Sequence, residues 1–147
     1  MPTNSRRGPG PVLFAAALVA AAVATGAGIS AAVHGADAPQ QPKRNILERH
    51  DQSGVEGYEV VLGTAQLAAG TTIDWHTHHG DETGYVVSGN LVLRVKDKPD
   101  RVLAAGDYFF NPAGLVHSVV AAPGTDGGTI VSTWVVQKGK PLAEPAG

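Results

Sequence analysis

Three histidines fall within four positions, at His76, His78 and His79, and a carboxylate, Glu82, follows them. Side chains on a β-strand alternate between its two faces, so His76 and His78 would point the same way, with α-carbons about 6.5–7 Å apart. Both imidazoles could then reach one ion, whereas His79 would face the other side. Imidazole nitrogen and carboxylate oxygen suit divalent Mn, Fe, Ni, Cu or Zn. The stretch therefore indicates a metal site; the alternatives are a hydrogen-bonded core histidine or a solvated turn.

A further histidine, His117, follows a turn signal. Asn111 precedes Pro112 and is therefore pushed toward extended geometry, which would end one strand. The pair Ala113 and Gly114 suits the turn that follows. His117 then lies within the next strand, which in antiparallel pairing could bring a third imidazole to the same cavity.

The elements that must position these residues are predicted to be strands, because no long segment has helical periodicity. Short apolar runs are instead separated by turn signals every 8–12 residues, which is typical of an all-β domain. We expect a small antiparallel β-barrel, a form that leaves no exposed edges. Its strands are expected near residues 45–49, 58–67, 71–78, 83–88, 91–96, 101–104, 107–110, 115–121 and 129–137.

The N-terminal segment is set apart by its composition. Arg6 and Arg7 precede an uncharged run, rich in alanine and valine, over residues 12–33. This layout predicts a signal peptide over residues 1–36, and hence an exported, periplasmic or secreted protein. An uncleaved membrane anchor is the alternative, since about 20 apolar residues can span a bilayer.

The rest of the chain divides into three further parts by composition. We expect a linker over residues 37–45, the β-barrel over 46–140 and a flexible tail over 141–147. The chain has no cysteine, which excludes disulfides, a thiolate nucleophile and sulfur-rich zinc sites. Loss of the two N-terminal arginines leaves nine basic residues against 13 acidic ones, a net charge of −4. The absence of a basic patch with interleaved aromatic residues argues against nucleic acid as a partner.

The spacing of these residues resembles both signature motifs of the cupin family. The first motif is G-x5-H-x-H-x3-E-x6-G, and its positions are Gly70, His76, His78, Glu82 and Gly89. The second is G-x5-P-x-G-x2-H-x3-N, and its matching positions are Gly106, Pro112, Gly114 and His117. The one departure is Ala121, where the family often has asparagine; that position is not one of the family's metal ligands. The resemblance covers roughly residues 57–137 and implies a double-stranded β-helix of jelly-roll type.

By this resemblance, the metal ligands are His76, His78, Glu82 and His117, and the cofactor is one divalent transition metal. The implied function is that of a metal-dependent enzyme of oxygenase type, similar to quercetin dioxygenases, acting on a small organic molecule. Glu82 could also act as a base, by analogy with some cupin oxygenases. The alternative is a non-catalytic cupin that binds a small molecule through its metal or simply holds metal. Small cupins usually pair, so a homodimer is expected.

Other residues are assigned by the alternation of faces and by their place in the chain. Val86, Leu93 and Phe110 are expected to line the cavity. The outer face or a seam between sheets is expected to hold Trp75, Tyr85, Phe109 and Val135. His50 lies outside both motifs and should be solvated, and His34 should leave with the signal peptide.

Overall fold

The structure is a computed structural model that describes residues 40–147. The predicted signal peptide or anchor, His34 and the first part of the predicted linker lie outside these residues. Within residues 40–147 no helix is long and apolar enough to cross a membrane.

The described part of the chain is all-β, as predicted, and every strand pairing in it is antiparallel. Its strands are β1 (Lys43–Asp51), β2 (Tyr58–Ala68), β3 (Thr72–Thr77), β4 (Gly80–Val95), β5 (Arg101–Ala104), β6 (Tyr108–Asn111), β7 (His117–Ala121), β8 (Gly127–Gln137) and β9 (Glu144–Pro145). The first strand begins within the predicted linker of residues 37–45, at Lys43.

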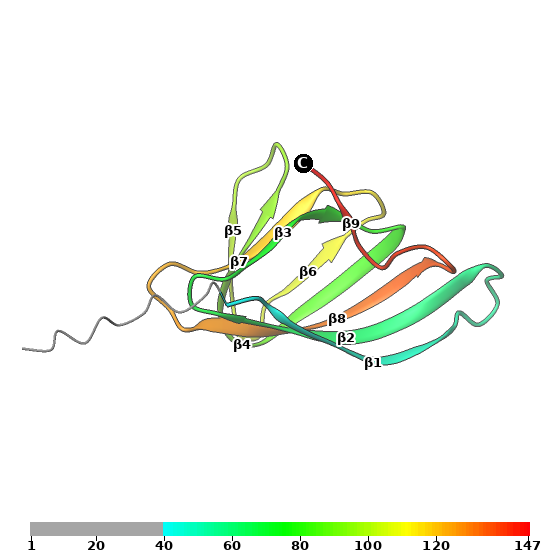
Figure 1. Ribbon diagram of the computed structural model, residues 1–147, viewed down its shortest axis with the longest axis horizontal. Coiled ribbons are helices and arrows are strands. Elements are labelled where there is room, and N and C mark those ends of the chain that lie inside the picture. The colour runs from blue at the N-terminus through cyan, green and yellow to red at the C-terminus, as the bar shows by residue number, and fades with distance from the viewer. Residues whose placement is uncertain (1–39) are drawn as a thin grey trace, which may run out of the picture. The chain divides into compact units, whose positions relative to one another are not determined.

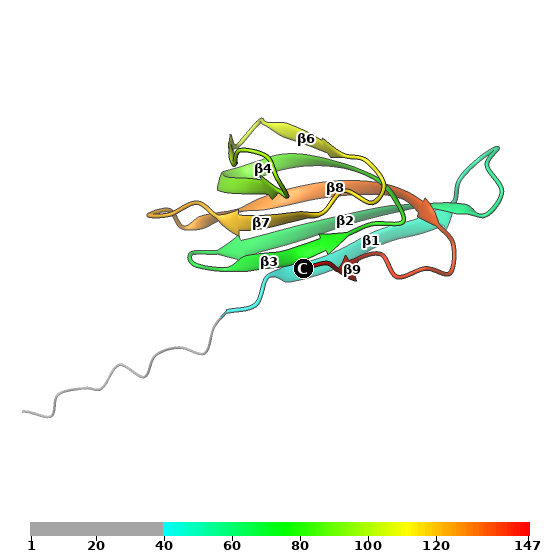
Figure 2. The same cartoon turned by 90° about the horizontal axis from the view of Figure 1, so that it is seen from above.

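The strands form a curled sheet with two layers that share one long strand (Figure 1, Figure 2). One layer has the order β1-β2-β8-β4-β6, and the other has the order β5-β4-β7-β3-β9. The first ten residues of β4 pair with β8 and β6, and its last six pair with β7 and β5. The polypeptide therefore turns from one layer to the other inside β4.

The turn inside β4 occurs at Gly89, where the sequence predicts a break between two strands. Gly89 has a φ of +78°, and a Cβ atom there would lie 2.0 Å from the carbonyl oxygen of Gly127. The pairing with β8 also shifts register between Val86 and Ser88. The positive φ and the bulge let the strand bend while its pairing continues, so a glycine that resembles a turn signal marks a corner.

The core lies between the layers. Its main cluster consists of the buried side chains of Leu67, Ile73, Val86, Leu91, Leu93, Leu103, Phe109, Val119, Ala121 and Ile130. Val86 and Leu93, which were expected to line the cavity, face inward and are 0% and 1% exposed, but they pack in the core and not in the cavity wall. Trp75, Tyr85 and Val135 are exposed, as expected for the outer face.

The two phenylalanines of β6 are reversed relative to the prediction. Phe109 is 1% exposed and Phe110 is 56% exposed, so Phe109 and not Phe110 faces the interior. The reason is a close fit between β6 and β4: Phe109 lies opposite Gly84, and a Cβ atom at Gly84 would meet the Phe109 ring at 2.1 Å. The ring fills the space over the glycine, which fixes the register and turns Phe110 outward.

The C-terminal segment is folded against the domain, whereas the sequence predicts a flexible tail over residues 141–147. Within it, β9 pairs with β3, with Pro145 opposite His76 and Glu144 opposite Thr77. The backbone N–H of Ala146 also donates a hydrogen bond to the carbonyl of Trp75 at 3.0 Å. The segment therefore covers the edge of β3, next to the histidines.

Candidate metal centre

Three histidines, two on paired strands and one directly after a strand, lie close together. His76 on β3 and His117 on β7 are cross-strand partners, and their ring centroids are 4.2 Å apart. His78 follows the end of β3, with ring centroids 4.9 Å from His76 and 5.2 Å from His117. One ring nitrogen from each residue lies within 4.8 Å of the other two. The structure therefore brings together the three imidazoles that the sequence singled out.

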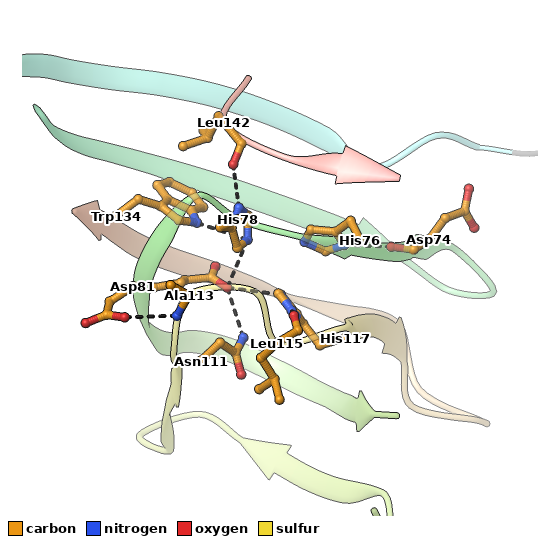
Figure 3. Close-up of polar contacts among 11 residues, drawn as sticks. Asp74, His76, His78, Asp81, Asn111, Ala113, Leu115, His117, Trp134 and Leu142 are labelled. Atoms are coloured by element: carbon orange, nitrogen blue, oxygen red, sulfur yellow. Dashed lines mark hydrogen bonds and ion pairs between the residues drawn. The ribbon is translucent and has the colours of Figure 1, made fainter. Parts of the chain in front are cut away.

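Each imidazole is held by a backbone carbonyl (Figure 3). The Nδ1 atom of His76 lies 2.6 Å from the carbonyl oxygen of Asp74, and that of His117 lies 3.0 Å from the carbonyl of Leu115. Nδ1 of His78 bonds the carbonyl of Leu142. A carbonyl oxygen only accepts, so each Nδ1 must donate its proton. In the neutral rings Nε2 is then the unprotonated atom, which is the usual arrangement of metal-binding histidine.

Glu82, on β4, lies beside these nitrogens with its side chain buried. Its Oε2 atom is 3.1 Å from Nε2 of His117 and 3.4 Å from Nε2 of His78. Asn111 Nδ2 donates a further hydrogen bond to the same oxygen at 3.0 Å. Burial acts to raise the pKa of Glu82, but the close contacts with the His117 and His78 rings outweigh it and hold the pKa well below the usual carboxyl range. Glu82 is therefore ionised.

The contact between His117 and Glu82 tests whether a metal fits. Nδ1 of His117 already donates to a carbonyl, so its neutral ring has no proton on Nε2 to offer the Glu82 carboxylate 3.1 Å away. Two electron-rich atoms at this distance require a cation, either a second proton on the ring or a metal ion. Three imidazoles and one carboxylate form a donor set of the kind that divalent Fe, Mn, Ni, Cu or Zn accept. The residues present fit such an ion.

The protonation of His76 favours the same conclusion. Burial lowers the pKa of His76 to about 4, and the hydrogen bond to the Asp74 carbonyl only partly opposes this effect. His117 and His78 lower the pKa further. His76 is therefore neutral at pH 7, and neutral imidazole is the form that binds metals.

The histidines open onto a cavity of ≈ 70 Å³. A water molecule needs roughly 10–15 Å³ of such volume, so the cavity holds a few waters or part of a small organic molecule. Its wall is mostly apolar, and the apolar members are Ile46, Ala65, Ile73, Phe109, Val119, Ile130, Leu142 and Ala143. The polar members besides the histidines are Arg44, Thr64, Glu82, Ser132 and Trp134.

The remaining described histidines lie outside this cluster. His79 is one position beyond His78, and its Nε2 atom lies 2.9 Å from Oε1 of Glu144 on β9. His50 is exposed on β1, as expected, and its Nδ1 atom lies 3.1 Å from the carbonyl oxygen of Asp51. Neither belongs to the group of histidines close enough to share an ion.

Three residues of the centre have no counterpart in the sequence-based prediction of the site. Asn111 orients Glu82, Trp134 Nε1 donates to His78 Nε2 at 3.3 Å, and the carbonyl of Leu142 holds the His78 ring. The sequence contains a partial indication that Asn111 belongs to the site, because this residue directly precedes the motif proline. It contains no indication for Leu142, because a backbone acceptor does not depend on residue type.

The domain is an all-β protein with a cluster of histidines between the layers of its curled sheet. Comparison of its sequence with known families gives the family. Residues 63–136 match the family described as Cupin domain, which is half of the chain, so this chain belongs to the cupin family. The uncharacterized protein YdbB of Bacillus subtilis (strain 168) is 36% identical over 74 residues. That alignment spans 49% of this chain and 64% of the Bacillus protein.

Solved structures are similar in fold. A cupin-like protein from Thermotoga maritima MSB8 superposes with a TM-score of 0.52 at 25% identity, covering 72% of this chain and 76% of that one. The DMSP lyase DddQ from Ruegeria pomeroyi DSS-3 gives a TM-score of 0.56 at 18% identity, covering 76% of this chain and 55% of that one. These likenesses support the double-stranded β-helix predicted from the sequence.

Proposed function

We propose that this protein is a metal-dependent cupin enzyme of oxygenase type that acts on a small organic molecule outside the cytoplasm. The observation that carries the proposal is the arrangement of His76, His78 and His117. Their Nδ1 atoms are each fixed by a carbonyl, and their nitrogens converge at the wall of a mostly apolar cavity. A site prepared in this way orients its ligands before any ion arrives.

In this proposal the ion is held by the three histidines and Glu82. When bound, the metal would supply Lewis acidity toward a substrate oxygen and, if it is redox-active, chemistry with dioxygen. Four protein donors leave about two positions on an ion that accepts six. The apolar wall would exclude bulk water from the substrate, and the carbonyls of Asp74, Leu115 and Leu142 would keep the rings in place.

Glu82 is better suited to be a ligand than a base. A general base works best when its pKa lies near the operating pH. The pKa of Glu82 is held well below the usual carboxyl range, so the group would take up a proton weakly. Asn111 also ties Oε2 in place. Both effects suit an anion that stays beside the metal.

The test begins with elemental analysis of purified protein and continues with oxygen uptake in the presence of a panel of enediols and phenolics. The proposal predicts bound Fe, Mn, Ni, Cu or Zn, and oxygen consumption with at least one panel member. Metal-loaded protein that consumes no oxygen and transforms no panel member would contradict the enzymatic part.

A second candidate is a non-catalytic cupin that binds a small molecule through its metal or simply holds the ion. The observation in its favour is the composition of the cavity wall. Beyond the four ligand candidates, its polar side chains are Arg44, Thr64, Ser132 and Trp134, which include no ordinary acid–base group at pH 7. Tight binding of a panel member without turnover would favour this candidate.

The location outside the cytoplasm is supported by the sequence of residues 1–36. We expect the mature N-terminus, determined by mass spectrometry, to fall between Thr25 and Pro39. Recovery of the protein in the membrane fraction with an intact N-terminus would indicate the anchor instead.

A further inference from the structure

Arg44 lines both an inner cavity and an outer cleft of the domain. It lines the inner cavity together with the histidines, and it also lines an outer cleft of ≈ 570 Å³ with Asp74 and Trp75. His76 and Ala143 are likewise shared by the two hollows. A molecule that reaches the histidines from the outer cleft would therefore pass the Arg44 side chain.

The strand β1 places Arg44 on the inner side of the sheet. Arg44 pairs with Ala65 and Ile46 pairs with Gly63, and both side chains of β1 contribute to the cavity wall. Lys43, one position earlier, pairs with Gln66 and lines a different hollow. Neighbouring basic residues thus lie on opposite faces of one strand, and only Arg44 faces the histidines.

The charge of Arg44 has no partner within the part of the chain that the structure describes. Arg49 pairs with Glu59 and Arg94 pairs with Asp100, but no carboxylate of residues 40–147 lies within 4.0 Å of the Arg44 guanidinium. Besides the histidines, the charged residues of the inner cavity are Arg44 and Glu82. Glu82 accepts a hydrogen bond from Asn111 and faces the histidine nitrogens, so in the proposed site its charge is directed at the metal and not at Arg44.

We propose that Arg44 is a specificity-determining residue that binds the carboxylate of a small organic acid, whose second oxygen donor lies at the histidine cluster. This inference rests on the proposed function, because it assumes a divalent ion there. An ion of charge +2 with Glu82 would leave an excess charge of +1 beside a mostly apolar wall, and the exposed Arg44 adds a second positive charge between this cavity and the outer cleft. An anionic ligand compensates that excess, and a guanidinium binds carboxylates through two parallel hydrogen bonds.

The experiment uses metal-loaded protein, with malonate as the anionic probe and malonamide as a neutral molecule of similar size. Affinities are measured by calorimetry for the parent and for Arg44→Gln, Arg44→Lys and Lys43→Gln, and metal content is measured in parallel. Loss of a charge-assisted contact should weaken malonate binding about 10- to 100-fold in Arg44→Gln. Arg44→Lys should bind with intermediate affinity, because lysine keeps the charge and loses the planar fork.

Three controls separate the explanations. Arg44→Gln should keep its metal and bind malonamide as the parent does, and Lys43→Gln should bind malonate as the parent does. A metal-loaded parent that does not bind malonate, or Arg44→Gln that binds it equally well, would overturn this inference and leave the metal site intact. A parent that takes up no metal would overturn the proposed function, and this inference with it.

Discussion

The carbonyl oxygen of Leu142 accepts a hydrogen bond from Nδ1 of His78, although 64 residues separate the two. The contact depends on the C-terminal segment, whose strand β9 lies against β3. It leaves Nε2 as the unprotonated nitrogen of the neutral His78 ring. The last residues of the chain thus help to prepare the metal centre.

Deletion of residues 141–147 should therefore weaken metal binding. Loss of a partner that orients a metal-binding histidine typically lowers affinity about 10- to 100-fold. The measurement is competition with a chromogenic chelator for the ion bound to each protein. Glu144→Gln is the matched control, because it changes a side chain that contacts His79 and leaves the Leu142 carbonyl in place. Equal metal affinity in the truncated and parent proteins would contradict the role given to Leu142.

The stability of the metal-free protein should depend on pH through His76. The folded-state pKa of His76 is about 4, against 6.5 for the free side chain. Between these values the unfolded chain binds more protons, so the free energy of unfolding should fall as the pH drops from 6.5 to about 4. Glu82 acts in the same direction, because a carboxylate with a lowered pKa loses its contribution as it is protonated at acid pH.

The loss due to His76 should be roughly 1–3 kcal/mol, since the ring is partly exposed and solvent screens its charge. Urea denaturation at a series of pH values checks this expectation. His76→Gln should flatten the pH dependence, and substitution of the exposed His50 by alanine should leave it unchanged. A parent protein whose stability is constant across this range would contradict the assignment.

The sequence predicted much of the centre because its signals are local. Alternation along one strand predicted that His76 and His78 point the same way. Antiparallel pairing was expected to bring His117 to the same cavity, and His117 lies opposite His76. Phe109 and Phe110 were reversed because alternation separates two faces without saying which is inner, and the close fit at Gly84 decides that. The Leu142 carbonyl could not be predicted, since β9 has only two residues and one of them is proline.

The homodimer remains a prediction, and a group of exposed aromatic side chains is the surface we expect it to use. The outer face of the layer that contains β4 and β6 exposes Tyr85, Tyr108 and Phe110 as neighbours, with Tyr108 opposite Tyr85. A two-fold dimer would place these aromatic side chains against their own copies.

We expect light scattering at micromolar concentration to give the mass of a dimer. A protein carrying both Tyr108→Lys and Phe110→Lys should be monomeric. Val102→Lys, a change at a 71% exposed site in the other layer, should leave the dimer intact. A monomeric parent would show the prediction to be wrong.

The central claim is that His76, His78 and His117 bind one metal together and that His79 does not. The most direct measurement is the metal content, by elemental analysis, of the parent and of three single alanine variants. The parent should hold one ion per chain, whereas His78→Ala and His117→Ala should lose most of it and melt at a lower temperature. His79→Ala should keep its metal, with at most a small loss of stability from the broken contact with Glu144. An empty site in His79→Ala together with a full one in His78→Ala would contradict the account.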